Sequence, residues 1–215
     1  MKTRRDGEAT RESILKAASA VFGKKGFHKA THAEISRVAE VNTALINFHF
    51  RSKDDLYKAV YERAERDVER IYPITGGVPA EAPAPQRLHG FISSLLNRAL
   101  DPRLEGFHRI MAMEMLNPTG LLDDVISQRR REHHNCMRGI IRGLLGQCAD
   151  DRTVEYCEMS VFSQCHMALP RPARRCPKPY KHSDVNALTE HITTFSLAGV
   201  AAVRRRLEER VECSL

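Results

Sequence analysis

The chain lacks any long apolar run. No stretch approaches the roughly 18 consecutive apolar residues that a membrane-spanning helix needs, and the basic N-terminal segment has no apolar core of the kind a secretory signal carries. We therefore expect a cytoplasmic protein that does not enter a membrane. In that reducing compartment the six cysteines, all in the second half of the chain, are not expected to form structural disulfides.

Motifs of metal, redox and hydrolytic chemistry are also missing. No two cysteines have C-x-x-C spacing, the usual pattern of a zinc ribbon or a thioredoxin-type site. A Cys–His hydrolase, for example one using Cys165 with His134, is a weak alternative because no Gly-rich nucleophile turn or oxyanion-hole motif accompanies the pair. We expect no enzymatic activity, no cofactor and no bound metal.

Positive charge is present, but it is unevenly placed. The formal net charge is +7. Residues 1–60 hold 12 Lys and Arg against 7 Asp and Glu, a net charge of +5, whereas residues 61–215 hold 22 against 20, a net charge of +2. A basic surface near the N-terminus attracts phosphate groups without reading base sequence. Nucleic acid is therefore a candidate partner.

The most informative segment is THAEISRVAEVNTALINFHFRSK, which has the signals of two short helices around a tight turn. Thr31 with Glu34 has capping-box spacing, and Asn42 is a good N-cap for a helix over 43–49. Ser52, followed three residues later by Asp55, gives a similar capping signal for the helix expected from residue 53. Helices this short are stable only when docked on neighbours, where one of them can face a DNA major groove.

The remaining sequence is helical in pattern and contains no β-hairpin signal. Apolar residues recur at helical spacing, and glycine or proline ends the segments. The expected fold is all-α with about nine helices. The longer helices are expected at about 9–25, 53–72, 86–100, 104–116, 121–147, 153–169 and 184–212.

A segment rich in glycine and proline, 74–85, interrupts the helical pattern and indicates a linker or an exposed loop between helices. We expect a helix-turn-helix DNA-binding domain at 1–53 and a connecting helix at 54–73. After the linker, a regulatory and dimerisation domain is expected at 86–215.

The order and spacing of the N-terminal blocks resemble a known family. From 10 to 57 the chain is similar to the DNA-binding domain of TetR/AcrR-type transcriptional regulators. The matching blocks are ILKAASAVFGKKGF, Thr31, ISRVAEV, NTALINFHF and RSKDDLY. Two positions depart from the family pattern, with Glu40 in place of a turn glycine and Asn47 in place of a tyrosine. A glutamate in a left-handed turn costs about 1 kcal/mol, so we expect the turn either to differ slightly from that of the family or to be strained at Glu40.

The second half is similar to the CecR-like branch of this family through SVFSQCHMALPRPARR and EHITTFSLAGVAAV. This resemblance implies a C-terminal domain that binds a small-molecule effector and dimerises. The expected function is that of a repressor released from its operator by the effector. A regulator that senses a metal or a thiol, and a DNA-binding protein with no ligand, are the alternatives.

The residues expected at DNA lie in the helix-turn-helix and at the N-terminus. They are Thr31, Asn42, Thr43, Ala44, Asn47, Phe48, His49, Lys53, Arg4 and Arg5. The start of the recognition helix faces base edges in such motifs, and Asn47 can pair with adenine or phosphate. Phe48 either touches a thymine methyl or packs in the core. The resemblance places His49, Lys53 and Thr31 on the DNA backbone, and His49 can also be purely structural.

Candidates for the effector site are apolar, with a few polar groups among them. They are Phe107, His108, Met111, Met115, Phe162, Cys165 and His166. Each of them is also a reasonable core residue. For the sensing alternatives, His133 and Cys136 share a helix face and suit a metal ion. Cys157, Cys165 and Cys176 are candidate reactive thiols, of which Cys176 lies among basic residues.

The expected partners are a double-stranded DNA operator, a small-molecule effector and a second copy of the chain. Two-fold symmetry of a homodimer predicts a palindromic operator. We expect the dimer to form through the last two helices, where small and apolar residues cluster. These residues are Ala198, Gly199, Ala201 and Ala202, with Leu197, Val200 and Val203.

Overall fold

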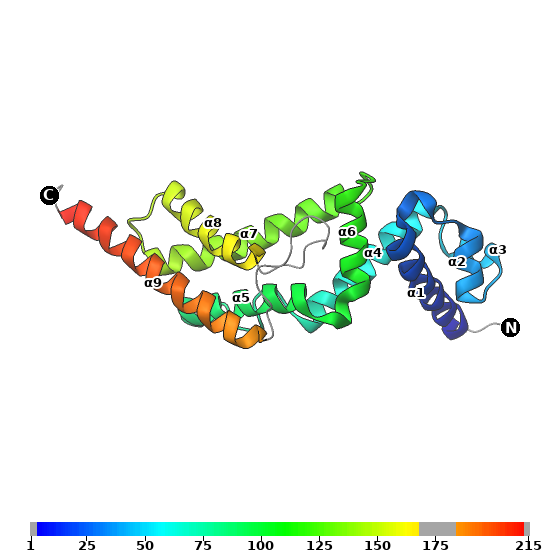
Figure 1. Cartoon of the computed structure of the whole chain (residues 1–215), viewed down its shortest axis with the longest axis horizontal. Coiled ribbons are helices and arrows are strands. Elements are labelled where there is room, and N and C mark those ends of the chain that lie inside the picture. The colour runs from blue at the N-terminus through cyan, green and yellow to red at the C-terminus, as the bar shows by residue number, and fades with distance from the viewer. Residues whose placement is uncertain (1–3, 168–183, 213–215) are drawn as a thin grey trace. The chain divides into compact units, whose positions relative to one another are not determined.

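The computed structural model describes residues 4–167 and 184–212. These ranges contain nine α-helices and one 3-10 helix and no strand, which confirms the all-α prediction (Figure 1). The helices are α1 (Arg4–Lys29), α2 (His32–Ala39), α3 (Thr43–His49), α4 (Lys53–Ile71), α5 (Ala84–Leu100), η1 (Pro102–Leu104), α6 (Glu105–Leu116), α7 (Asp123–Leu145), α8 (Asp151–Met167) and α9 (Val185–Glu212). None of these helices is long and apolar enough to span a membrane.

Helix α1 begins earlier than the apolar pattern predicts. Its backbone is already helical at Arg4, so the two N-terminal arginines belong to its first turn and not to an extended arm. The side chains of Arg4 and Arg5 lie outside the described residues. Gly26, the predicted stop, has φ 75° and ψ 170° and breaks the helical geometry close to the predicted end.

The described residues form two compact units. Unit 1 consists of those in 1–70 and 102–126, and unit 2 of those in 71–101 and 127–215. Helix α6 therefore packs with the N-terminal helices, although the sequence groups it with the C-terminal ones. Each domain expected from the sequence is one continuous range of residues. Each unit, in contrast, combines two ranges that are separated in the sequence.

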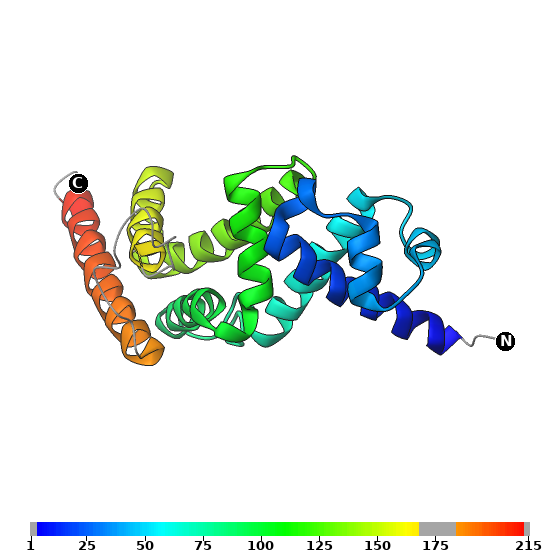
Figure 2. The same cartoon turned by 45° about the vertical axis from the view of Figure 1, so that its right-hand side comes forward.

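The core of unit 1 is made by α1 to α4 together with α6. Its fully buried side chains include Ile14, Leu15, Ala18, Phe22, Ile35, Ile46, Leu56, Tyr57, Val60, Ile110 and Leu122. Helix α6 lies against α1 (Figure 2). The two backbones approach closely at Gly23, where an added Cβ would lie 3.2 Å from the Cβ of Arg109. Helix α6 thus completes a core whose other helices lie in the N-terminal part of the chain.

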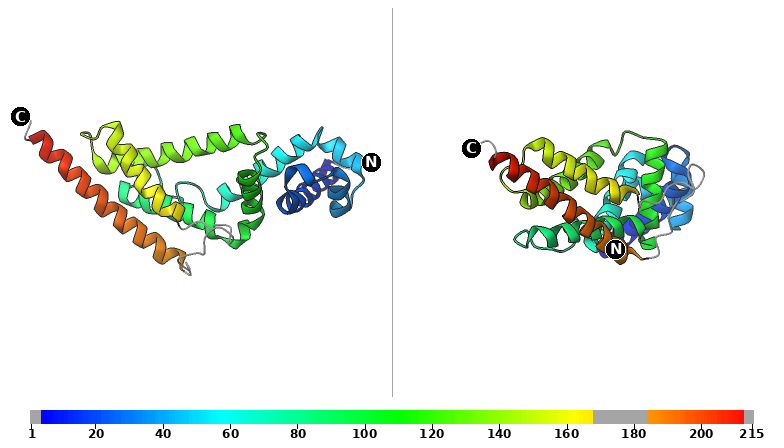
Figure 3. Two further views of the ribbon diagram at one scale, coloured as in Figure 1. Left: turned by 45° about the horizontal axis from the view of Figure 1, so that its top comes forward. Right: turned by 60° about the vertical axis from the view of Figure 1, so that its left-hand side comes forward.

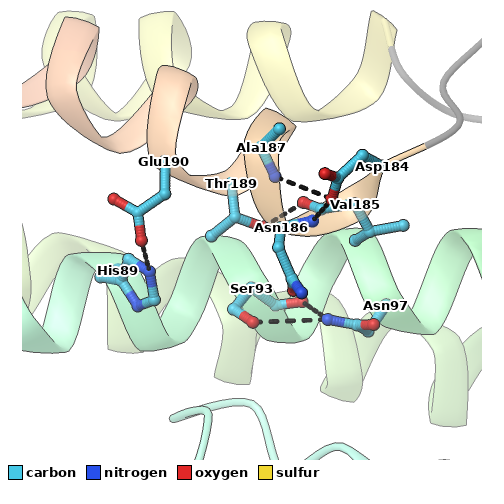
Figure 4. Close-up of polar contacts among 9 residues, drawn as sticks. All are labelled: His89, Ser93, Asn97, Asp184, Val185, Asn186, Ala187, Thr189 and Glu190. Atoms are coloured by element: carbon cyan, nitrogen blue, oxygen red, sulfur yellow. Dashed lines mark hydrogen bonds and ion pairs between the residues drawn. The ribbon is translucent and has the colours of Figure 1, made fainter.

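Unit 2 packs α5, α7, α8 and α9 around a second core. Its buried side chains include Leu88, Phe91, Ile92, Leu96, Met137, Ile140, Ile141, Val154, Val161, Ile192 and Val200. Helix α9 lies along α5 and α8 (Figure 3). Asp184 caps α9 by accepting the backbone N–H groups of Asn186 and Ala187, and His89 of α5 is 2.9 Å from the carboxylate of Glu190 (Figure 4).

The start of the segment expected to be a linker is a turn docked on α5. The carbonyl oxygen of Tyr72 accepts a bond from Arg98 Nε at 2.7 Å and one from Ser94 Oγ at 3.2 Å. A Cβ added to Gly90 would lie 2.6 Å from the carbonyl oxygen of Thr75, so only glycine fits there. Gly90 lets the backbone of α5 touch the turn at Thr75. The start of this segment is therefore fixed within unit 2.

The two short helices begin where their caps predict. Thr31 Oγ1 accepts the backbone N–H of Glu34 at 3.2 Å, and Asn42 Oδ1 accepts that of Ala44 at 2.9 Å. The predicted capping box is only half formed, because the carboxylate of Glu34 pairs with Lys25 at 2.8 Å. Local side-chain chemistry thus determines both helix starts.

The turn between α2 and α3 is left-handed at Glu40. This residue has φ 55° and ψ 38° and is the only described non-glycine residue with positive φ. Its backbone N–H bonds the carbonyl of Ser36, as does that of Val41 at 3.0 Å. The turn is therefore strained at Glu40, since a Cβ crowds this conformation.

Replacing Glu40 with glycine should stabilise the protein by about 0.5 kcal/mol. Relief of the left-handed strain contributes about 1–2 kcal/mol, and the added freedom of the unfolded chain removes about 0.4–1 kcal/mol. Urea unfolding measures the difference. The control is Glu40→Ala, which removes the carboxylate but keeps the strain. If the glycine variant is no more stable than the alanine variant, the backbone at Glu40 is not strained.

Candidate nucleic-acid interface

Helix α3 presents one face to solvent and buries the other. Ala44, Asn47 and Phe48 are exposed, and Phe48 is 81% exposed despite being aromatic. On the opposite side Ile46 is fully buried, and Phe50 just after the helix is 4% exposed. An exposed face with a small residue, an amide and an aromatic ring has the groups that contact base edges and thymine methyls.

Three other residues expected at DNA have structural roles. The side-chain oxygens of Thr31 and Asn42 cap their helices, which leaves the Asn42 amide N–H2 as its free donor. Thr43 is half-buried, and its hydroxyl lies 3.1 Å from Ser36 Oγ, which joins α3 to α2. Substituting any of them therefore perturbs the helix geometry as well as any DNA contact.

His49 is half-buried between two aromatic rings. Its ring centroid lies 5.2 Å from that of exposed Phe48 and 6.4 Å from that of buried Phe50. The Arg11 guanidinium lies 5.2 Å from the Phe50 ring centroid. His49 thus connects the core to the exposed side of α3, which is compatible with both its expected roles.

Lys53 is tied to the end of α1. Its ammonium nitrogen lies 4.4 Å from the Phe27 ring centroid and donates to the carbonyl oxygen of Ala30 at 3.3 Å. An ammonium group carries three N–H donors, so others remain for a phosphate. Lys53 therefore fixes the loop before α2 as well as being a candidate phosphate contact.

Sequence reasoning missed two cations and misplaced one apolar residue. Arg37 near the end of α2 and Arg51 between α3 and α4 are both exposed. Their positions inside the helix-turn-helix could have identified them, because exposed cations near a recognition helix are candidates for phosphate contact. Helical periodicity puts Val38 on the same face of α2 as buried Ile35, but Val38 is 44% exposed. A seven- or eight-residue helix has too few turns to locate its inward face reliably by periodicity.

The candidate effector residues fall into different units. Phe107, His108, Met111 and Met115 lie on α6 in unit 1, whereas Phe162, Cys165 and His166 lie on α8 in unit 2. Phe107 and Met111 pack against the core of unit 1, and Met115 is 80% exposed. Their role at an effector stays a prediction.

In unit 2, Phe162 is the centre of a group of rings. Its centroid lies 5.8 Å from that of Phe91, 5.0 Å from that of His134 and 5.9 Å from that of His166. His134 Nδ1 lies 2.5 Å from an oxygen of buried Glu158, which joins α7 to α8. Phe91 is buried and Phe162 is half-buried, whereas His134 and His166 are exposed. A group of rings at the edge of the core suits either packing or an apolar ligand.

The thiol and metal alternatives gain no support. Burial raises the pKa of the Cys165 thiol to about 12 and also raises that of Cys157, so both thiols stay protonated near neutral pH and are poor nucleophiles. Cys176 lies outside the described residues. Within the described ranges, no group of three or more His, Cys, Asp or Glu side chains is placed to hold a metal ion. His133 and Cys136 thus lack further ligands there.

Comparison with known proteins agrees with this arrangement. Residues 14–60 match the family described as bacterial regulatory proteins, tetR family. Residues 84–200 match the one described as HTH-type transcriptional dual regulator CecR, C-terminal domain. A TetR-like transcriptional regulator from Rhodococcus sp. RHA1 shares the fold with a TM-score of 0.66 at 17% identity, covering 94% of this chain and 99% of that chain.

Two curated relatives are similar in the N-terminal region. The AcrR regulator of Shigella flexneri is 31% identical over 70 residues, which is 33% of each chain. The BepR repressor of Brucella suis biovar 1 is 37% identical over 70 residues, 33% of this chain and 34% of the relative. The chain thus matches about a third of the length of these relatives. Since the CecR-type match covers more than half of the sequence, the chain belongs to the TetR family of transcriptional regulators.

Proposed function

We propose that the protein is a sequence-specific DNA-binding transcriptional regulator that acts as a repressor. The observation that carries the proposal is the exposed face of α3, where Ala44, Asn47 and Phe48 stand on a helix anchored by buried Ile46. Such a face reads bases, while cations around it bind phosphate. The repressor mode is supported by the name of the BepR relative, and the CecR domain description leaves activation at some operators open.

We also propose that the protein acts as a homodimer through α8 and α9. Tyr156 and Met159 of α8 and Phe195 of α9 are 57%, 60% and 63% exposed. A Cβ added to Gly199 would meet nothing within 4 Å. Large apolar side chains left in solvent on neighbouring helices indicate an interface, and a glycine among them permits close approach. The face differs in part from the expected one, because Val200 is buried in the core of the subunit.

A small-molecule effector is the third part of the proposal. It is supported by the resemblance of the C-terminal half and by the group of rings around half-buried Phe162. If the effector binds a conformation that fits the operator poorly, effector and DNA must weaken each other's binding by the same factor. The expected outcome of effector binding is therefore release from DNA.

The DNA contacts are tested on sequences that the full chain selects from a random pool. Asn47→Ala should change the preferred base at one position of each half-site, because an amide reads adenine. Lys53→Ala should lower the slope of log affinity against log salt by about one unit, because one phosphate contact is lost. It should also weaken operator binding more than binding to unrelated DNA, because Lys53 also bonds the loop before α2. Binding is measured by fluorescence anisotropy over a range of salt concentrations.

The matched control is Arg66→Ala, which removes an exposed cation further along α4. It should leave both the preferred bases and the salt slope unchanged. If Asn47→Ala selects the same sequence as the parent, and Lys53→Ala has the same slope as the Arg66 variant, α3 and the start of α4 do not contact DNA as proposed.

The dimer face is tested by Phe195→Asp. A charge in the centre of an apolar interface leaves an unpaired buried group, so the variant should be monomeric at micromolar concentration. Light scattering after size-exclusion chromatography measures the mass. Thr194→Asp introduces the same charge at the exposed neighbouring position, which points to another side of α9, and should remain dimeric. A dimeric Phe195 variant would show that the interface lies elsewhere.

A further inference from the structure

Helix α6 contributes a buried acidic residue to the core beneath the DNA-binding helices. Glu114 near the end of α6 is 5% exposed and belongs to unit 1. The phenol of Tyr57 on α4, which is 1% exposed, donates to Glu114 Oε2 at 2.8 Å. Burial, together with the neighbouring carboxylate, raises the pKa of the Tyr57 phenol, so it remains a hydrogen-bond donor at neutral pH.

The second oxygen of the same carboxylate fixes the turn that follows α6. Glu114 Oε1 accepts the backbone N–H and the hydroxyl of Thr119, each at 2.8 Å. Thr119 Oγ1 in turn accepts the N–H of Leu121 at 3.1 Å. Three hydrogen bonds thus converge on one buried side chain, which holds α4 and the turn after α6 together. Removing one partner from such a network leaves a buried polar group unsatisfied.

Ring packing continues from Tyr57 towards the DNA-binding surface. The Tyr57 ring centroid lies 4.9 Å from that of Phe22 and 5.1 Å from that of Phe27. Phe27 also contacts the Lys53 ammonium, which lies 4.4 Å from its ring centroid and bonds the carbonyl of Ala30. Ala30 directly precedes the cap of α2. A continuous set of contacts therefore runs from Glu114 to the start of the helix-turn-helix.

We infer that Glu114 is a positioning residue for the DNA-binding surface, acting through Tyr57, Phe27 and Lys53 on the loop before α2. This inference rests on the proposed function. It makes the end of α6 and the turn after it part of the DNA-binding unit, although they lie within the residues that match a C-terminal domain. Operator affinity then depends on residues that do not touch DNA.

Two variants disturb this network with little change in side-chain shape. Tyr57→Phe deletes the phenol donor, and Glu114→Gln replaces one carboxylate oxygen by an NH2 group, so the side chain can no longer accept from both Tyr57 and Thr119. Each should weaken binding to the selected operator by about tenfold, because the helices that read bases are misplaced. Affinity for unrelated DNA should change less than twofold, about the limit of a binding measurement, and the salt slope should stay the same, because the phosphate contacts remain. The double variant should be no weaker than the single ones.

Two controls separate positioning from loss of stability. Ile110→Val truncates a fully buried side chain on the same helix, and it should lower the melting temperature without changing the ratio of operator to non-operator affinity. Glu105→Gln makes the acid-to-amide change at an exposed position of α6 that pairs with Arg109, and it should have no effect on binding.

Hydrogen exchange provides a readout that does not need DNA. The backbone N–H of Glu34 donates to Thr31 Oγ1 at 3.2 Å, so it reports on the start of α2. Its exchange should be at least threefold faster in Tyr57→Phe and Glu114→Gln than in Ile110→Val, since only the first two release the loop.

The outcomes separate the inference from the proposed function. If the parent protein selects no DNA sequence, the proposed function is wrong, and the exchange of Glu34 still tests the connection from Glu114. If the parent selects an operator but both variants keep the affinity ratio and the exchange rate of Ile110→Val, Glu114 is only a core residue and the inference is overturned.

Discussion

Helix α3 has seven residues, and a helix shorter than about 12 residues is marginal in water, so its geometry depends on burial against the rest of unit 1. Ile46 is fully buried and Phe50 is 4% exposed. Burying side chains of this size stabilises the docked helix by about 1.5–3 kcal/mol each. The core that receives them includes Tyr57 of α4 and Ile110 of α6. Helix α3 packs directly against α1 and α2, so these two helices set the orientation of its exposed face, and α4 and α6 complete the core of the unit.

In the proposed function, the same arrangement would separate the residues that give affinity for DNA from those that give sequence specificity. Asn47 and Phe48 project from α3 and can distinguish bases. The cationic groups lie on the surrounding segments, with Arg37 on α2, Arg51 after α3 and Lys53 at the start of α4. Phosphate contacts by these groups would hold the protein at a fixed register while α3 reads the sequence. The ammonium of Lys53 also bonds the backbone before α2, so one side chain serves both the fold and the surface.

Features that depend on neighbouring residues were predictable from the sequence, and features that depend on distant ones were not. The caps at Thr31 and Asn42 act within three residues, so the helix starts were predicted correctly. At Glu40 the family pattern predicted either a different turn or a strained one, and the structure has the strained, left-handed turn. Contacts such as Tyr57 with Glu114 join residues 57 positions apart, and nothing in the local pattern identifies the partner. The division into units does not follow the order of the chain for the same reason, because α6 joins a core whose other helices lie in the first 70 residues.

The central claim is that a symmetric pair of α3 helices reads DNA. Footprinting of the full chain on DNA selected from a random pool tests it most directly, with hydroxyl radicals to report protection of the backbone and dimethyl sulfate to report guanine N7 atoms in the major groove. The account predicts protection in two symmetric half-sites whose centres are about one helical turn apart, with the major-groove bases of each half-site in contact with the protein. Uniform weak protection along the DNA, or a single asymmetric protected site, would contradict it.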